Sequence, residues 1–244
     1  MLKADNIEAH KKRFAMFRAN RDLRTAAFDM VGGGDYEMVG YTESLLLNKM
    51  APVPEHGMLI DIGCGPGRLA RYLKARNDLR YLGTDVVPEL LEVAAAECGR
   101  KDWTFAKVDG FEIPVESGCA DIVVCFSVFT NIYPEESFLL VREATRVLHP
   151  GGKMLISYFD IEVPAHRKTF LDLVEHQHKR IDPLVFLSRQ YLEFFAGENG
   201  FKNLQFVRPE EIHLTPEEGF KLLDGRELLT GVGFNQMICI MVKE

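Results

Sequence analysis

The sequence predicts an α/β fold, a doubly wound and mostly parallel sheet of seven strands flanked by helices. Short apolar runs alternate with helical patterns from Met58 onward, which is the pattern of repeated strand–helix–strand units. The run at 120–128 is almost wholly apolar, as expected for a central parallel strand. Glycines and prolines separate the runs and mark the turns between elements.

Residues 1–50 are expected to be mainly helical and to form a cap or lid ahead of the sheet. Apolar residues recur there at spacings that suit one helix face: Ile7, Phe14, Phe17 and Leu23. Three glycines at 32–34 interrupt the pattern, and a further helix is expected over 41–50. Prolines at 52 and 54 then mark the boundary with a core that runs from 51 to 244.

The core is expected to alternate strands with helices. Strands are expected at 58–62, 80–86, 103–109, 120–128, 153–159, 204–209 and 235–243. Helices are expected at about 66–75, 88–99 and 188–199, with another that starts at 134 and ends at the His-Pro-Gly-Gly segment. Two insertions interrupt this order, a helical one at about 160–187 and an irregular one at about 210–234.

The composition is that of an ordinary globular protein, with 47% hydrophobic and 27% charged residues. We expect no membrane span and no secretory signal, because neither apolar pattern occurs. The five cysteines form no C-x-x-C pair and are odd in number, which favours reduced thiols in the cytoplasm and no metal site. A net charge of −7 argues against a nucleic-acid partner. The oligomeric state is left open.

A glycine-rich loop follows the first strand of the core. Gly63, Gly65 and Gly67 form a G-x-G-x-G pattern that Asp61 precedes. Glycines let a backbone approach a ligand closely, and open α/β sheets bind ligands at the carboxyl ends of their strands. Arg68 stands where the dinucleotide pattern G-x-G-x-x-G requires its third glycine. This departure argues against the first alternative, a nicotinamide-dependent oxidoreductase.

Two carboxylates end the next two strands. Asp85 follows Asp61 at about the distance where a ribose-binding acid is expected, and a carboxylate accepts hydrogen bonds from both ribose hydroxyls. Asp109 and Gly110 end the third strand. At this position the carboxylate can accept a hydrogen bond from the amino group of an adenine, and a backbone N–H can donate a hydrogen bond to an adenine ring nitrogen. An Asp-Gly pair by itself is usually only a turn, so the adenine reading rests on the upstream motifs.

In this order the motifs resemble those of class I S-adenosylmethionine-dependent methyltransferases, of the small-molecule, methyltransferase type 11-like kind. The resemblance runs from about Met58 to Phe159 and rests on LIDIGCGPGRLA, YLGTDVVPELLEVA, AKVDGFEIPVESGCADIVVCFSVFTNI and EATRVLHPGGKMLISYF. It implies a Rossmann-like sheet whose last strand is antiparallel and inserts beside the fifth. It also implies S-adenosyl-L-methionine as cofactor, with in-line transfer of its methyl group to an O or N atom of a small acceptor.

The resemblance also implies where the cofactor is held. The glycines would line its methionine part with Asp61 bracing the loop, the second strand would bind ribose, the third would hold adenine, and the fourth would flank the sulfonium. The implied cofactor-binding residues are Asp61, Gly63, Cys64, Gly65, Gly67, Asp85, Val86, Asp109, Gly110, Phe126 and Ser127. A second alternative, a cofactor-binding regulatory subunit without catalysis, would carry the same residues.

The acceptor side is less well marked. The family often has histidine shortly after the fourth strand, but this sequence reads Phe-Thr-Asn at 129–131, which leaves the base unassigned. The weak catalytic candidates are Thr130, Tyr158, Asp160 and His166. Further acceptor contacts are expected from Asn131 and Tyr133, and from Tyr36 and Tyr41 beside the glycines at 32–34. His176 and His178 are two residues apart and share no helix face, so no zinc pair is expected.

Overall fold

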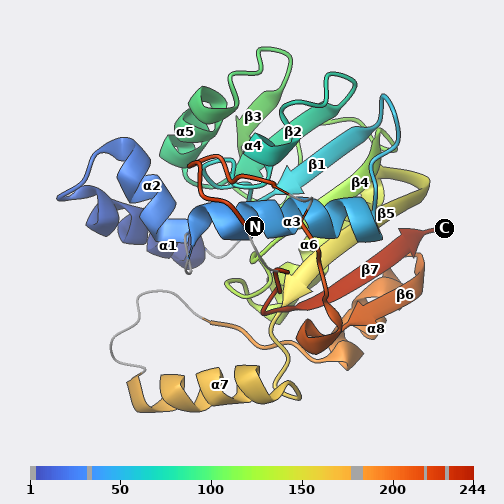
Figure 1. Ribbon diagram of the computed structural model, residues 1–244. Helices are drawn as coiled ribbons and strands as arrows, with labels where there is room; N and C mark the ends of the chain where they lie inside the picture. Colours follow the sequence, from blue (N-terminus) through green and yellow to red (C-terminus); the bar gives the residue numbers. More distant parts are fainter. Residues whose placement is uncertain (1–3, 32–34, 177–183, 217–218, 229–230) are drawn as a thin grey trace.

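The structure is a computed structural model that describes residues 4–31, 35–176, 184–216, 219–228 and 231–244 (Figure 1). Within these ranges no helix has the length and apolar character needed to cross a bilayer. In the same ranges, no cluster of three His, Cys, Asp or Glu side chains is arranged to hold a metal ion. All five cysteines are free thiols.

A single seven-stranded sheet forms the centre of the molecule, in the order β3-β2-β1-β4-β5-β7-β6. Its strands are β1 Met58–Ile62, β2 Arg80–Asp85, β3 Thr104–Lys107, β4 Ala120–Cys125, β5 Leu148–Tyr158, β6 Phe201–Val207 and β7 Met237–Lys243. Neighbours from β3 through β5 are parallel, and β7 runs antiparallel between β5 and β6. The expected Rossmann-like sheet, including its antiparallel last strand, is confirmed. The strand order reverses between β1 and β4, which is where such sheets bind ligands.

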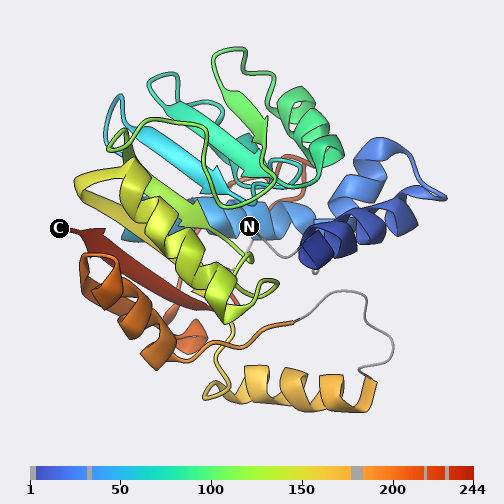
Figure 2. The same cartoon turned by 180° about the vertical axis from the view of Figure 1, so that it is seen from behind.

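Helices cover both faces of the sheet (Figures 1 and 2). They are α1 Ala4–Arg18, α2 Leu23–Val31, α3 Tyr36–Met50, α4 Ala70–Leu73, α5 Pro88–Cys98, α6 Pro134–Val147, α7 Pro164–His176 and α8 Arg189–Glu198, with a short 3-10 turn η2 at Pro209–Glu211. One buried cluster joins the sheet to α6 and α8, and a second joins its other face to α3, α4 and the segment 212–234. A third cluster packs α1 and α2 against α5.

Local chemistry sets the ends of these helices. Pro88 occupies the first turn of α5, where its missing N–H costs no hydrogen bond. The helix ends at Gly99, whose left-handed φ of 64° lets its N–H bond the Ala95 carbonyl. The α3 helix begins at Tyr36 rather than at the expected Tyr41, because the Asp35 side chain caps it by accepting from the Met38 N–H at 3.0 Å.

Several expected boundaries were wrong for physical reasons. The helix expected at 66–75 is only the four residues of α4, because the preceding loop turns through left-handed glycines. The strand expected at 120–128 stops at Cys125, shortly before Ser127 adopts a φ of 60°, which no strand accommodates. In contrast, β5 starts early at Leu148 through an irregular register with β4. In the two stretches expected to be insertions, the described residues form α7 and, between η2 and β7, a largely irregular path. That these stretches are insertions stays a prediction.

Candidate functional site

A cavity of about 610 Å³ lies where β1, β2 and β4 end, at the reversal of strand order. Its floor comes from the loops that follow these strands, and its walls come from α1, α2, α3 and the residues just before β7. Its size is within the roughly 300–1,000 Å³ typical of ligand pockets. Every cofactor-binding residue expected from the sequence lines this cavity except Gly67 and Asp109.

The glycine loop approaches the cavity as bare backbone. Gly63 and Gly65 have φ of 70° and 54°, a region that favours glycine. A Cβ on Gly63 would lie 2.4 Å from Val128 Cγ2, so no larger residue fits beside the loop after β4. Gly67 has a different role, since a Cβ there would lie 3.1 Å from Ala94 Cβ on α5. The third glycine therefore lets α5 pack close to the loop, and it does not line the cavity.

Asp85 ends β2 and holds the loop in place. Its Oδ2 accepts from the Gly65 N–H at 3.0 Å and its Oδ1 accepts from the Val87 N–H at 2.9 Å. Burial raises the pKa of this carboxyl, while the two backbone N–H groups oppose the shift. Beside it, the hydroxyl of Thr84 is buried and has no hydrogen-bond partner among the described residues. A polar ligand that forms hydrogen bonds with Asp85 and Thr84 would give the Thr84 hydroxyl a partner. These residues therefore fit the hydroxyl-bearing ribose of an adenosyl cofactor.

Asp61 lies behind the loop and is almost wholly buried. Tyr81 donates its hydroxyl to Asp61 Oδ2 at 2.7 Å. Burial nevertheless raises the pKa of Asp61 to about 7, because a charged carboxylate loses its hydration there. Nearby, Arg68 pairs with Glu43 through contacts of 3.1 and 2.5 Å. This bond connects Asp61 on β1 to β2, and the bracing of the glycine loop by Asp61 stays a prediction.

The two residues expected to hold adenine are placed differently. Gly110 lines the cavity, as does the neighbouring Val108. The Asp109 carboxylate instead forms an ion pair with Lys107 at 2.6 Å, and its side chain is 70% exposed. The structure therefore does not bring this carboxylate into the cavity, and its adenine role stays a prediction.

A second group of polar side chains lies beyond β4. Ser127 holds its strained left-handed backbone because its N–H donates to Ser157 Oγ at 2.7 Å. Ser157 donates in turn to Gln236 Oε1 at 2.7 Å, and Gln236 Nε2 donates to Ser127 Oγ at 2.9 Å. This closed network joins the ends of β4 and β5 to the start of β7. No sequence motif marks Ser157 or Gln236, because only the β5–β7 register brings them to Ser127.

Of the four weak catalytic candidates, only Thr130 lines the cavity. Its hydroxyl donates to the Ser127 carbonyl at 2.8 Å. Tyr158 is fully buried in the core, and burial raises the pKa of its hydroxyl far above the ordinary value. Asp160 and His166 are buried at the corner before α7 and do not line the cavity.

His166 uses both ring nitrogens to hold that corner. Its Nε2 donates to the Asn235 carbonyl at 2.9 Å, and its Nδ1 lies 3.1 Å from both the backbone N and the carbonyl O of Asp160. Both ring nitrogens therefore contact backbone groups of this corner and not the cavity. Asn131 does line the cavity as expected, whereas Tyr133 does not.

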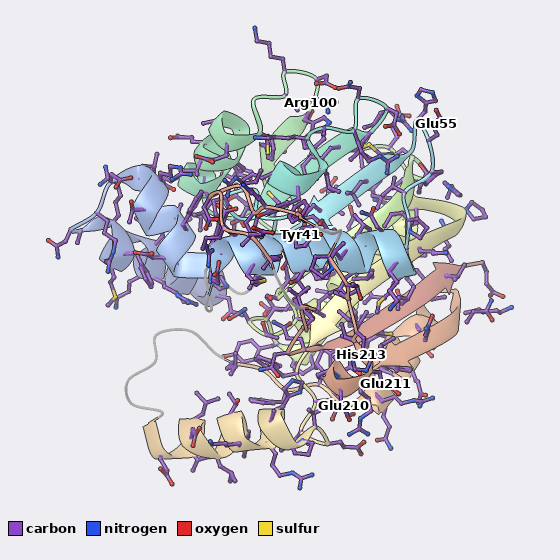
Figure 3. All side chains as sticks on the ribbon, in the orientation of Figure 1. Tyr41, Glu55, Arg100, Glu210, Glu211 and His213 are labelled. Carbon is purple, nitrogen blue, oxygen red and sulfur yellow. The ribbon has the colours of Figure 1, made fainter. Side chains whose placement is uncertain are left out.

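The N-terminal helices contribute more to the cavity than expected, but through other residues. The lining residues of α1 are Asn6, Ile7, His10 and Arg13. By contrast, Tyr36 donates to the Pro66 carbonyl at 3.1 Å and Tyr41 stacks on Phe220 with 4.0 Å between ring centroids. Figure 3 shows Tyr41 on α3, well away from Glu210, Glu211 and His213 beside η2. The glycines at 32–34 lie outside the described residues.

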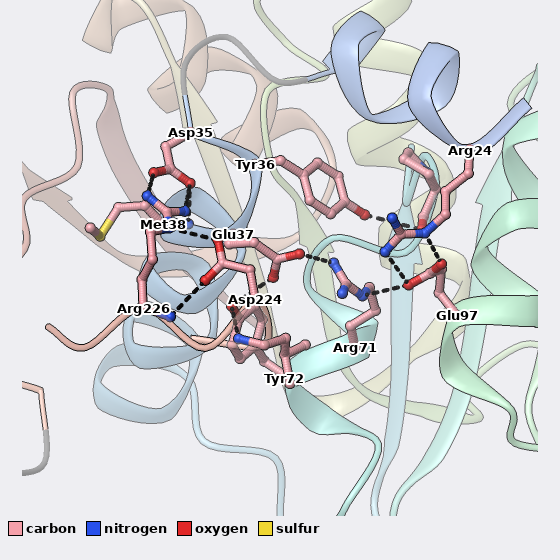
Figure 4. Close-up of polar contacts among 12 residues, drawn as sticks. Arg24, Asp35, Tyr36, Glu37, Met38, Arg71, Tyr72, Glu97, Asp224 and Arg226 are labelled. Atoms are coloured by element: carbon pink, nitrogen blue, oxygen red, sulfur yellow. Dashed lines mark hydrogen bonds and ion pairs between the residues drawn. The ribbon is translucent and has the colours of Figure 1, made fainter. Parts of the chain in front are cut away.

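Ion pairs connect α2 and α3 to the core, a buried one for α3 and a more exposed one for α2 (Figure 4). Glu37 of α3 accepts from Arg71 at 2.6 Å and from the Tyr72 hydroxyl at 2.9 Å. Arg71 also reaches Glu97 of α5 at 3.2 Å, and Arg24 of α2 pairs with the same carboxylate. Because partly buried pairs lose more when one partner is removed than exposed pairs do, α3 is firmly docked.

Comparison with known proteins matches this fold and site to one class. Residues 60–156 match the family model described as "Methyltransferase domain". An uncharacterized methyltransferase-like protein of Schizosaccharomyces pombe is 28% identical over 212 residues, which cover 83% of this chain and 77% of that one. A tRNA (carboxymethyluridine(34)-5-O)-methyltransferase of Macaca fascicularis is 29% identical over 118 residues, 48% of this chain but only 17% of that enzyme.

Among solved structures, a methyltransferase of Thermotoga maritima aligns with a TM-score of 0.59 and 19% identity, covering 85% of this chain and 90% of that one. Such low identity supports the fold alone. With the match at residues 60–156, it identifies the chain as carrying a methyltransferase domain. Residues 60–156 therefore match a methyltransferase domain, and the fold is that of S-adenosylmethionine-dependent methyltransferases, in agreement with the motif order.

Proposed function

We propose that this chain binds S-adenosylmethionine in the cavity and transfers its methyl group to an O or N atom of a small molecule. One observation carries the proposal. The glycine and carboxylate cradle and the polar network after β4 line the same cavity, and α1 forms part of its wall. An acceptor that reaches the methyl group must enter this covered space, which favours a small molecule over a polymer.

Each part of the cavity then has a task. Gly63 and Gly65 would hold the methionine part, and Asp85 would accept hydrogen bonds from the ribose hydroxyls. The bound cofactor supplies an electrophilic methyl group. The protein's own contribution is to hold the acceptor in line with that group, at roughly 3 Å, and to exclude water. Phe126 and Ser127 end β4 between the two regions and would flank the sulfonium.

Two experiments test the proposal in sequence. Calorimetry with S-adenosylmethionine and with its product S-adenosylhomocysteine should show one site per chain. Incubation with radiolabelled methyl donor and pools of small molecules should then yield labelled product and S-adenosylhomocysteine only when an acceptor is present. Cofactor binding without product from any pool would favour the regulatory-subunit alternative. Labelled tRNA in place of a labelled small molecule would favour an acceptor like that named for the macaque relative.

We further propose that residues 1–50 act as a cap over a core formed by 51–244. The support is that α1 lines the cavity, while α3 is docked by the buried Glu37–Arg71 pair and α2 packs its apolar face against α5. Deleting α1 alone, residues 2–18, should leave the docked helices in place and make S-adenosylhomocysteine dissociate roughly tenfold faster, since affinity changes within one site usually appear in the dissociation rate. Stopped-flow displacement measures this rate. An unchanged rate in a folded deletion variant would contradict the cap.

A further inference from the structure

The cavity has two chemically different halves. The cofactor half lies over β1 and β2 and contains ionisable side chains, including Asp61, Asp85 and the Glu43–Arg68 pair. On α1, His10 lies within electrostatic range of Asp85. The other half, which we call the acceptor half, lies where β4 and β5 end and β7 begins. It is lined by Ser127, Asn131, Phe159, Leu184, Phe234 and Gln236, none of which is ionisable.

In the part of the chain that the structure describes, hydrogen-bond counting leaves several open polar groups in the acceptor half, namely the Ser127 hydroxyl proton, the Asn235 amide, an acceptor on Asn131 and a donor on Gln236. The Asn131 amide uses its two N–H groups on the Ser127 carbonyl at 2.7 Å and on Thr130 Oγ1 at 2.9 Å. Gln236 uses its oxygen and one N–H in the network with Ser157 and Ser127. Among the described residues, the Asn131 Oδ1 and the second N–H of Gln236 therefore have no partner. Together they match a group that both donates and accepts a hydrogen bond.

The remaining walls of the acceptor half are apolar. Phe234 packs edge-on to Phe126 with 5.9 Å between ring centroids, and Phe159 stacks on Phe186 at 5.7 Å. Leu184 reaches the cavity because the N–H of the next residue, Val185, donates to the Thr130 carbonyl at 2.8 Å. Burying a carboxylate, phosphate or ammonium against such walls is costly when no opposite charge faces it. A ring or alkyl body, in contrast, loses nothing by leaving water.

We propose that the acceptor is an uncharged molecule with an apolar ring body and a phenol- or enol-type hydroxyl, and that Asn131 and Gln236 select it by binding that hydroxyl. This inference rests on the proposed methyl transfer. The hydroxyl oxygen forms a bond to the methyl carbon as the carbon–sulfur bond breaks. The electron pair of that bond stays on sulfur to give S-adenosylhomocysteine, and the hydroxyl proton passes to water.

The phenol or enol type follows from the side chains present. An alcohol oxygen becomes a strong nucleophile only when a base takes its proton. No described residue of the acceptor half is a base, because its polar side chains are amides and hydroxyls. The hydroxyl of a phenol or enol is weakly acidic and depends less on a protein base, because water can take its proton. Asn131 and Gln236 then act by position and selectivity.

The test compares three probes that share a naphthalene ring: 2-naphthol, 2-naphthoate and protonated 2-naphthylmethylamine. Protein is first saturated with S-adenosylhomocysteine, and binding of each probe is then measured by calorimetry. We expect 2-naphthol to bind at least about tenfold more tightly than either charged probe, because no described residue of the acceptor half carries a charge that would pair with a buried carboxylate or ammonium group. Equal or tighter binding of naphthoate or the ammonium probe, or no binding of 2-naphthol, would overturn the inference.

Variants that introduce a charge test whether Asn131 and Gln236 cause the preference for a neutral probe. Gln236→Glu should weaken 2-naphthol binding about tenfold, because the N–H donor is lost, and should strengthen binding of the ammonium probe. Asn131→Asp, on a different element, should also favour the ammonium probe, so a folding defect in one variant leaves the other. The matched control Gln205→Glu, exposed on β6, should change neither. Unaltered selectivity in both site variants would contradict their role.

The first step also separates the two claims. If S-adenosylhomocysteine does not bind the wild-type protein, the proposed function fails and this inference fails with it. If S-adenosylhomocysteine binds and the probes show no preference for the neutral member, only the acceptor class is wrong. Both site variants are compared with the wild type at saturating S-adenosylhomocysteine, so that a change in cofactor affinity does not alter the probe measurement.

Discussion

The cofactor half and the acceptor half of the cavity differ in how the chain assembles them. In the cofactor half, Gly65 and Asp85 are bonded across 20 residues of sequence, and in the acceptor half Ser127 and Gln236 are bonded across 109. The first pair belongs to one strand–helix–strand unit, whereas the second depends on how β7 inserts beside β5. The comparison teaches that, under the proposed function, a contiguous sequence motif would hold the cofactor, while segments distant in sequence would shape the space for the acceptor.

The largest expected effect separates the halves directly. Asp85→Ala should raise the dissociation constant for S-adenosylhomocysteine by about 10- to 100-fold, because charge-assisted hydrogen bonds to ribose are lost. The matched change Asp109→Ala should cost only several-fold, because that carboxylate is exposed and must leave Lys107 to reach adenine. Calorimetry on both variants checks this order. A loss for Asp109→Ala as large as for Asp85→Ala would show that the carboxylate turns inward on binding.

A second pair of variants tests whether the cofactor half and the acceptor half are in contact at Gly63. Gly63→Ala and Gly65→Ala both place a side chain at positive φ, which costs roughly 1–2 kcal/mol. Only Gly63→Ala also pushes on the acceptor side, since its Cβ would lie 2.4 Å from Val128 Cγ2, whereas the Gly65 Cβ would lie 3.5 Å from Val31 Cγ1. We expect Gly63→Ala to weaken both cofactor and 2-naphthol binding by about tenfold or more.

In the same experiment, Gly65→Ala should weaken mainly the cofactor and leave 2-naphthol binding, measured at saturating S-adenosylhomocysteine, close to wild type. Melting temperatures of the two variants provide the control for general loss of structure. If both variants changed 2-naphthol binding equally, the contact between Gly63 and Val128 would not be what couples the halves.

The smallest expected effect concerns the buried carboxyl of the cofactor half. Burial raises the pKa of Asp61 from 3.8 to about 7, so the folded chain holds this proton more tightly than the unfolded chain does. Its stabilising contribution is complete below pH 3.8 and is lost as the pH rises through about 7. Asp61→Asn removes this dependence, so the variant should gain about 2 kcal/mol relative to wild type between pH 5 and pH 8.

Thermal unfolding at the two pH values measures this gain. Asp78→Asn is the control, because the pKa of that half-buried carboxyl is lowered by its hydrogen bond to Arg76, and its titration falls below the window. A relative stability of Asp61→Asn that stayed constant between pH 5 and pH 8 would show that Asp61 is ionised throughout the range.

The sequence was sufficient for most of the fold because local signals specify it. The apolar run of β4, the proline and glycine that bound α5, and the alternation of elements all act within a few residues. The extent of α4 was missed because loop glycines in left-handed conformations replaced its first turns. The apolar pattern does not indicate where α3 starts, because the side-chain cap of Asp35 sets that end of the helix.

The predictions for the site follow the same rule, because residues within a local motif were predicted and residues that only the tertiary structure brings together were not. The glycine loop and Asp85 were found because their spacing is a motif, and the structure places them together. Gln236 was missed because nothing near it in sequence indicates that it faces Ser127. His166 was proposed as a candidate on residue type alone, but its two ring nitrogens are used to hold a corner. Residue type suggests chemistry, whereas access to the cavity depends on the tertiary packing.

A crystal structure of the chain with S-adenosylhomocysteine tests the central claim most directly. We expect the amino-acid end against Gly63 and Gly65, the ribose hydroxyls on Asp85, and the sulfur directed toward the space between Asn131 and Gln236. Density for the ligand outside this cavity, or with its sulfur turned away from the amide pair, would contradict the division of the cavity into a cofactor half and an acceptor half.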